Sequence, residues 1–176
     1  MPTGGWNILG VRPLIGVHIS ARRPSQRWPA DRFAELIIAL NQRHGAATLF
    51  FWSPGAENHP QHPGDDAKAA TVIARVGKDA LLLPYPTAAL ADLIGALSVC
   101  DAVVCSDGGA MHLAAGLGKP LACFFGDSLL ERWRPWGVRH SILQAGSRNV
   151  ADIPVDEAAG AIATLVQDCP ASSARL

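Results

Sequence analysis

The stretch AVVCSDGGAMHLAAGL, residues 102–117, joins a predicted strand to a predicted helix. Residues 102–105 form a short, wholly apolar run, which is typical of a strand buried on both faces of a sheet. A helix is predicted over residues 109–117, with glycine near both of its ends. Gly108 and Gly109 let the backbone turn tightly and bring its N–H groups close to a ligand. Because a helix N-terminus favours negative charge, this turn is a candidate anion site.

The same alternation of strand and helix patterns extends over the rest of the chain. Strands that alternate with helices, and strands that are apolar throughout, indicate an α/β fold with a parallel sheet covered by helices on both faces. Strands are predicted over residues 14–20, 47–52, 80–83, 102–105, 120–125 and 141–143. Helices are predicted over residues 29–44, 67–76, 109–117 and 155–166, with one more that follows Thr87 as its N-cap.

Two of these helices carry apolar residues at the i, i+3, i+4, i+7 spacing of a single buried face. Trp28 precedes the first of them, and we expect it to anchor the start of that helix by packing. Residues 129–137, rich in Trp and Arg, are predicted to form a loop. The two faces consist of Phe33, Leu36, Ile37 and Leu40, and of Leu90, Leu93, Ile94 and Leu97.

Composition excludes several classes of protein. The chain has 176 residues, 49% of them hydrophobic, with 15 Lys+Arg balanced by 15 Asp+Glu, as in one ordinary globular domain. Zero net charge removes the overall attraction that a nucleic-acid-binding protein exerts, so no nucleic acid is expected as a partner. No apolar run approaches the roughly 20 residues that cross a bilayer. Residues 1–10 lack the basic start and apolar stretch of a signal peptide.

Neither a metal nor a cofactor is expected. The four cysteines form no C-x-x-C pair and are predicted to be reduced and structural. His59 and His62 have no third ligand at a suitable spacing. The chain has no P-loop lysine motif, no G-x-G-x-x-G after its first strand and no G-x-S-x-G. Kinases, dinucleotide-dependent dehydrogenases and α/β-hydrolases therefore lose their main sequence support.

The loop SARRPSQRWP, residues 20–29, follows the first predicted strand. Ligands of parallel α/β sheets bind outside the carboxyl ends of the strands, which is where this loop begins. Its arginines and small polar side chains suit phosphate oxygens, although a solvated charged loop has the same composition. The candidate residues are Ser20, Arg22, Arg23, Gln26 and Arg27.

Other candidates lie in the loops after the remaining strands. His112, in the first turn of the helix that starts at Gly109, is placed to reach the same anion, or is a plain surface histidine. Asp107 either caps that helix or faces the ligand and repels phosphate. Glu57 is placed to accept from the two hydroxyls of a ribose, or simply starts a helix. Trp133 and Trp136 form a wall for a sugar or base, or cover the sheet edge.

Together these motifs resemble a known family. SQRWP at 25–29, Glu57, SDGGAMHLAA at 106–115, GKP at 118–120 and FG at 125–126 resemble the C-terminal domain of the lipopolysaccharide heptosyltransferases, glycosyltransferase family 9. The resemblance extends over about residues 15–166. It implies a Rossmann-like three-layer α/β/α parallel sheet, one half of a GT-B glycosyltransferase, in which two such domains face each other across a cleft.

The resemblance also implies roles for single residues. Asp107, Gly108, Gly109 and His112 would hold the diphosphate and sugar of an ADP-sugar donor, typically ADP-heptose, and Glu57 would hold the ribose. Many relatives have Lys where Gln26 stands, so one charge contact is lost unless Arg23 or Arg27 replaces it. The donor-binding residues expected here are Ser20, Arg22, Gln26, Arg27, Glu57, Asp107, Gly108, Gly109 and His112. No catalytic residue is expected, because the family's catalytic carboxylate lies in its N-terminal domain.

A full member of the family has two domains and about twice this length. We therefore expect residues 1–176 to be a single donor-binding domain, inactive alone, with the acceptor-binding domain outside this chain. The resemblance implies a cytoplasmic bacterial enzyme at the inner face of the inner membrane, with a lipopolysaccharide-core acceptor and inverting transfer. A homodimer through the exposed interdomain face near Trp133 and Trp136 is a further expectation. The alternatives are a standalone nucleotide-binding module and a flavodoxin-like enzyme with bound flavin.

Overall fold

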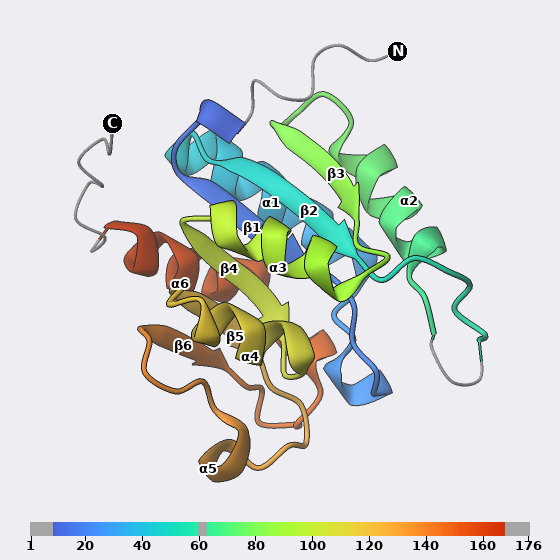
Figure 1. Ribbon diagram of the computed structural model, residues 1–176, viewed down its shortest axis with the longest axis vertical. Helices are drawn as coiled ribbons and strands as arrows, with labels where there is room; N and C mark the ends of the chain where they lie inside the picture. Colours follow the sequence, from blue (N-terminus) through green and yellow to red (C-terminus); the bar gives the residue numbers. More distant parts are fainter. Residues whose placement is uncertain (1–8, 60–62, 168–176) are drawn as a thin grey trace.

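Six parallel strands form one sheet in the order β3-β2-β1-β4-β5-β6 in the computed structural model, which describes residues 9–59 and 63–167 (Figure 1). This is the strand order of the Rossmann fold. Successive strands are added on one side of β1 up to β3, and then on its other side from β4 to β6. The predicted α/β fold with a parallel sheet is therefore confirmed. The strands are β1 (Leu14–His18), β2 (Ala47–Trp52), β3 (Leu82–Pro86), β4 (Ala102–Ser106), β5 (Leu121–Phe124) and β6 (His140–Leu143).

Helices cover both faces of this sheet and complete the three predicted layers (Figure 1). One face packs against α1 (Ala30–His44), α2 (Asp66–Val76) and α6 (Val155–Gln167). The other packs against α3 (Leu90–Val99) and α4 (Gly109–Gly116). Short elements in the loops after β1, β5 and β6 are η2 (Pro24–Gln26), α5 (Leu130–Trp133) and η3 (Val150–Asp152).

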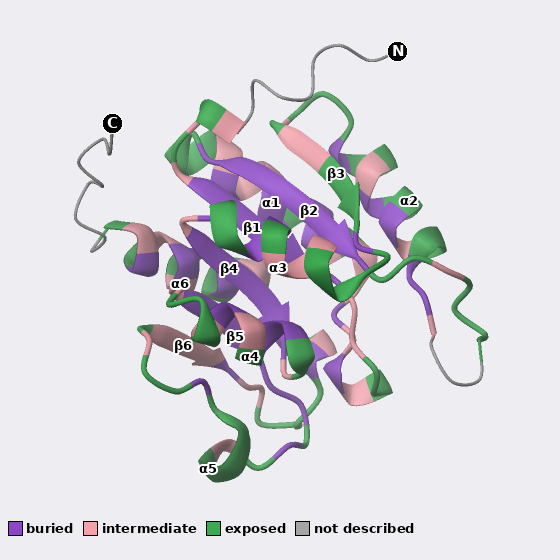
Figure 2. Ribbon diagram, in the orientation of Figure 1, coloured by how far each residue is buried: buried purple, intermediate pink, exposed green. Residues whose placement is uncertain are grey.

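The central strands are buried on both sides, which explains their continuous apolar sequences (Figure 2). Successive side chains of a strand point to opposite faces. Ile15 and Val17 of β1 accordingly pack with the α1 layer, and Leu14 packs with the α4 layer. The predicted inner face of α1 is confirmed, because all four of its apolar residues are at most 1% exposed.

Trp28 anchors the connection between β1 and α1, as expected. Its side chain is 1% exposed and lies against the rings of Phe33 and Phe124, at centroid distances of 5.0 and 4.6 Å. Its indole Nε1 donates to the carbonyl of Ile153 at 3.0 Å. These contacts fix the segment that leads from the end of β1 into α1, and so fix the arginine-rich loop before it.

Three details of the predicted elements are wrong. β3 continues through Pro84 to Pro86. Proline has no N–H to donate, but β3 is an edge strand with a neighbour on one side only, so the missing donors can fall on its free side. Thr87 does not cap α3, because its hydroxyl donates to the carbonyl of Trp52. The start of α3 is held instead by Asp92, which accepts from the N–H of Ala89. Leu90, placed on the buried face of α3, is 63% exposed.

Other differences are smaller. The predicted loop 129–137 contains the single turn α5, and β1 ends two residues earlier than predicted. Cys100, Cys105 and Cys123 are free and buried, as predicted, whereas Cys169 lies outside the described residues, as does His62. Burial raises the pKa of Cys100 to about 12, so its thiol stays protonated.

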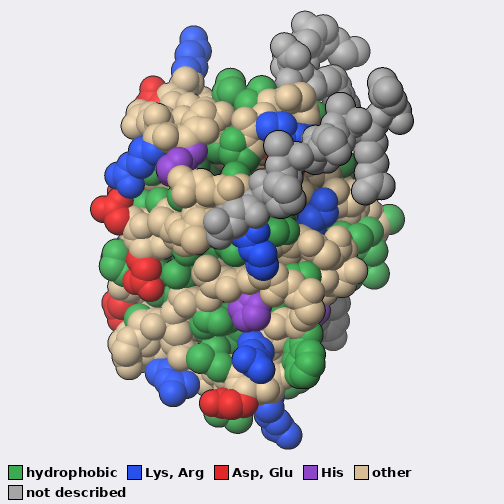
Figure 3. All heavy atoms as spheres, turned by 90° about the vertical axis from the view of Figure 1, so that its left-hand side faces the viewer, with side chains coloured by type: hydrophobic (Ala, Val, Ile, Leu, Met, Phe, Trp, Pro, Cys, Tyr) green, Lys and Arg blue, Asp and Glu red, His purple; other side chains and the backbone are tan. Residues whose placement is uncertain are grey.

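Basic and acidic side chains are interspersed on the face of the molecule shown in Figure 3. Over residues 9–59 and 63–167, no helix has the length and apolar character that a membrane span needs.

Candidate functional site

An open cavity of about 790 Å³ lies at the carboxyl ends of the strands. The loops after β1, β4 and β5 supply most of its wall, so it sits at the switch point of the sheet between β1 and β4. This is where a doubly wound sheet leaves a crevice, because the connections from the two central strands turn to opposite faces. Its lining includes His18, Ser20, Arg22, Arg23, Gln26, Ser106, Asp107, Gly108, Gly109, Asp127, Ser128 and Trp133.

The N-terminus of α4 forms one side of this cavity. Gly108 is the N-cap, and no side chain caps the helix, so Asp107 does not have the capping role considered above. A Cβ atom built on Gly109 meets no described atom within 4 Å, which means that there is open space beside this residue, and Gly108, Gly109 and Ala110 all line the cavity. The first N–H groups of a helix have no partner within it. The predicted anion site is therefore open to a ligand.

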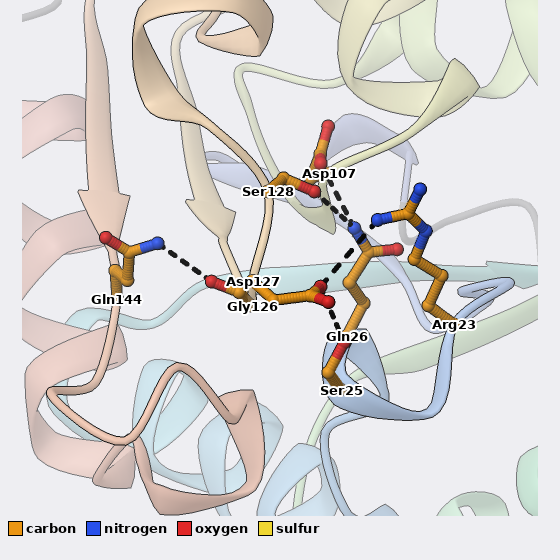
Figure 4. A network of polar contacts seen from close by, with 8 residues as sticks. All are labelled: Arg23, Ser25, Gln26, Asp107, Gly126, Asp127, Ser128 and Gln144. Carbon is orange, nitrogen blue, oxygen red and sulfur yellow. Dashed lines mark hydrogen bonds and ion pairs between the residues drawn. The ribbon is translucent and has the colours of Figure 1, made fainter.

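A polar network holds three of the cavity loops together (Figure 4). Gln26 is 5% exposed, and its Nε2 donates to Asp107 at 3.1 Å and to Ser128 at 3.0 Å. Its backbone carbonyl accepts from Ser106 at 2.8 Å. Gln26 therefore links the loop after β1 to those after β4 and β5. Sequence reasoning did not foresee this role, because the three partners lie about 80 to 100 positions away along the chain.

The loops after β1 and β5 also meet at Gly126 and Asp127 (Figure 4). The Ser25 hydroxyl donates to Asp127 at 2.9 Å, which lowers the pKa of that carboxyl and keeps it ionised. Arg23 lies 3.8 Å from the same carboxylate. A Cβ on Gly126 would lie 2.6 Å from the Ser25 carbonyl oxygen, so only glycine allows the two loops to approach this closely.

The arginines of the loop do not all face the cavity. Arg22 and Arg23 line it, but Arg27 does not. Arg27 donates to the carbonyl of Ala21 and forms an ion pair with Glu57. Glu57 and Arg27 line a neighbouring hollow, which Arg22 borders as well, so Glu57 lies beside the main cavity rather than in it.

The remaining predicted residues lie at or outside the rim. Ser20 lines the cavity, and its hydroxyl oxygen accepts from the N–H of Ser53 at 2.9 Å. His112 is exposed, is not among the lining residues, and has its ring centroid 6.3 Å from that of Trp133. Trp133 lines the cavity and is 50% exposed, whereas Trp136 is 76% exposed.

His18 is a cavity residue that the sequence interpretation missed. It is the last residue of β1 and is 7% exposed, and its Nδ1 has no hydrogen-bond partner within residues 9–59 and 63–167. Burial, and secondarily the charge of Lys68, lowers the pKa of His18 to about 4. Lys68, itself largely buried with its pKa lowered to about 8 by desolvation, donates to the carbonyl of Ile19. The sequence signal was a polar residue in an otherwise apolar strand.

His18 should make the chain less stable in acid. The unfolded chain binds a proton at His18 as the pH falls below 6.5, and the folded chain does so only near pH 4. The free energy of unfolding should therefore fall through this window by about 3 kcal/mol from His18. Urea unfolding of wild type and His18→Gln above and below the window measures this. His18→Gln should lose that part of the pH dependence, and His44→Gln, at the exposed end of α1, should keep it. Equal slopes in wild type and His18→Gln would contradict the assignment.

Comparison with known proteins gives a family and a fold. The sequence matches Glycosyltransferase family 9 (heptosyltransferase) over residues 7–157. It is 28% identical over 138 residues to lipooligosaccharide heptosyltransferase 2 of Haemophilus influenzae, covering 78% of this chain and 38% of that protein. The chain thus spans well under half of that relative's length.

Two solved structures show the likeness of fold. E. coli ADP-heptose lps heptosyltransferase II superposes with a TM-score of 0.75 at 23% identity, over 89% of this chain and 47% of that one. An E. coli heptosyltransferase solved with ADP gives a TM-score of 0.72 at 17% identity, over 87% and 44%. The match to slightly less than half of each structure agrees with the predicted fold class, one Rossmann-like half of a GT-B architecture.

Proposed function

Because the chain belongs to glycosyltransferase family 9 (heptosyltransferase), we propose that it is the donor-binding part of a lipopolysaccharide heptosyltransferase. The donor would be ADP-heptose or a related ADP-sugar, and the acceptor the inner core of lipopolysaccharide. The observation that carries this proposal is the switch-point cavity, which the open N-terminus of α4 lines together with Arg22 and Arg23. Both features suit the diphosphate of a nucleotide-sugar.

The donor has a natural orientation in this cavity. Its diphosphate would lie at Gly108 and Gly109, within reach of Arg22 and Arg23. Its ribose would point towards Glu57, which lies beside the cavity on the loop after β2. Asp107 and His112 would stand near the sugar. Gln26 would act through Asp107 and Ser128, whose side chains it holds, rather than as a cation on the phosphates.

The proposed chemistry is inverting transfer. A carboxylate of an acceptor-binding domain, outside this chain, would take the proton of the acceptor hydroxyl. The hydroxyl oxygen would then form a bond to the anomeric carbon, and the bond from that carbon to the diphosphate would break. The α4 N-terminus and the arginines would stabilise the charge that develops on the departing ADP. In this scheme the chain binds the donor but does not complete a transfer alone.

The proposal extends to organisation and location. Residues 1–176 would form one donor-binding domain of an enzyme that works in the cytoplasm, at the inner face of the bacterial inner membrane. The exposed Trp133 and Trp136 would meet the acceptor-binding domain or, in its absence, a second copy of this chain. Sedimentation of the chain at rising concentration checks whether two copies associate.

A standalone nucleotide-binding module is the alternative function. Such a module would bind ADP without supporting transfer when an acceptor-binding domain is supplied.

Calorimetric titration of the 176-residue chain with ADP is the direct test. We expect a dissociation constant between micromolar and millimolar, and about a 10-fold loss of affinity in Glu57→Ala, because a hydrogen-bonded charged group at the ribose is removed. With 2′,3′-dideoxy-ADP, which lacks the ribose hydroxyls, Glu57→Ala should cause a much smaller loss of affinity than with ADP. This comparison cancels the effect of freeing Arg27 from its ion pair.

Glu131→Ala removes an exposed carboxylate on α5 and serves as the control that should leave both affinities unchanged. Failure of the wild-type chain to bind ADP would overturn the assignment of the donor site. Equal losses for ADP and its dideoxy analogue would instead overturn the role of Glu57.

A further inference from the structure

The topology places His18 on the side of the sheet that α4 covers, in the cavity that the start of α4 also lines. In β1, Leu14 packs in the α4 layer, and alternation along the strand puts Gly16 and His18 on that same face. Phe51, another member of that layer, lies 5.4 Å from the His18 ring, measured between centroids. β1 pairs with β4, and α4 follows β4 directly. His18 and the N-terminus of α4 therefore lie on the same side of the sheet, and both line the cavity.

The two nitrogens of the His18 ring are in different surroundings. Nδ1 is enclosed and has no partner in the part of the chain that the structure describes, although His18 lines the cavity. The ring edge that can meet a ligand is consequently the one that carries Nε2. A neutral imidazole has one N–H and one bare nitrogen, and its low pKa of about 4 keeps His18 neutral at physiological pH.

The enclosure of Nδ1 decides which nitrogen carries the proton. A buried N–H without a partner is rarer in proteins than a buried acceptor without one. The proton therefore belongs on Nε2, where it faces the cavity as a donor. Nε2–H and the first N–H groups of α4 are all hydrogen-bond donors. Together they suit an anion, because its oxygens can accept from all of them.

We propose that His18 is a further donor-binding residue, whose Nε2–H donates a hydrogen bond to a phosphate oxygen of the nucleoside diphosphate at the start of α4. Two independent observations carry this: the uncapped, open N-terminus of α4, and a cavity-lining histidine more than nine-tenths buried that has no hydrogen-bond partner for its Nδ1 among the described residues. The inference rests on the proposed function, since it assumes a nucleoside diphosphate in this cavity.

A pair of amide substitutions tests which nitrogen matters. The amide nitrogen of Gln occupies about the place of histidine Nε2, and that of Asn the place of Nδ1. His18→Gln should bind ADP within about 3-fold of wild type, whereas His18→Asn should bind it about 10-fold more weakly or worse. Adenosine, which has no phosphate, should bind all three proteins alike. Equal ADP affinities in all three, or a loss for adenosine as large as that for ADP, would overturn the proposal.

Nitrogen-15 NMR of the wild-type imidazole gives a readout that does not depend on a variant's folding. His18, assigned by the signal lost in His18→Gln, should show a protonated Nε2 and a bare Nδ1. ADP and inorganic pyrophosphate should both shift Nε2. If pyrophosphate shifts it and ADP does not bind, the nucleotide assignment fails while the phosphate contact stands. If neither ligand moves the His18 signals, the inference itself is wrong.

Discussion

Replacement of Gly109 by Asp is expected to weaken ADP binding by about 100-fold or more and to leave the fold intact. The new carboxylate would stand at the first turn of α4, where the structure leaves open space. A like charge about 4 Å from a phosphate opposes binding by about 3 kcal/mol or more at a partly screened site, which corresponds to the stated factor. Calorimetry with ADP measures it.

The same substitution should not destabilise the chain. Gly109 has no positive φ, and a side chain there meets no protein atom within 4 Å. An acidic residue in the first turn of a helix adds about 0.3–1 kcal/mol of stability, and glycine in a helix is itself unfavourable. Urea unfolding should therefore show a stability equal to or above that of wild type, which separates loss of binding from loss of folding.

Gly109→Asn is the matched control, because it fills nearly the same volume without charge. Its ADP affinity should fall far less than that of Gly109→Asp, and the difference between the two reports the electrostatic part. If Asn and Asp weaken binding equally, space rather than charge governs this position. If neither weakens it, the diphosphate does not lie at the start of α4.

Trp28→Ala is expected to cost the most stability, about 3–5 kcal/mol of the free energy of unfolding. The substitution removes a ring that is 1% exposed and packs between Phe33 and Phe124, and it leaves a cavity there. It also removes the hydrogen bond from the indole to the carbonyl of Ile153, which keeps its bond from Arg32. Chemical unfolding followed by far-ultraviolet circular dichroism measures the loss.

Trp136→Ala is the control, because it makes the same replacement of tryptophan by alanine at an exposed position. Trp136 is 76% exposed, so its removal should change stability by no more than about 0.5 kcal/mol. If the two tryptophan variants lose similar stability, Trp28 is not the anchor of the β1–α1 connection that the packing indicates.

Local sequence patterns predicted the structure correctly where a feature depends on a single helix or strand. The spacing of Phe33, Leu36, Ile37 and Leu40 predicts the buried face of α1, because helical period and burial agree there. The turn at Gly108 and Gly109 likewise lies between a strand and a helix, as predicted. The pattern was misleading at Thr87, whose hydroxyl bonds a carbonyl on a neighbouring strand rather than the helix after it.

The sequence by itself determined the parallel α/β architecture, the strand-to-helix turn at Gly108 and Gly109, and the family. Only the tertiary structure decided how the loop side chains are used. It turns Arg27 towards Glu57, makes Gln26 the link to Asp107 and Ser128, and brings His18 into the cavity. The physical reason is that the formation of a helix or strand depends mainly on residues a few positions away in the sequence. Polar partners at the carboxyl edge of a sheet come from loops far apart in the chain, which only the pairing of the strands brings together.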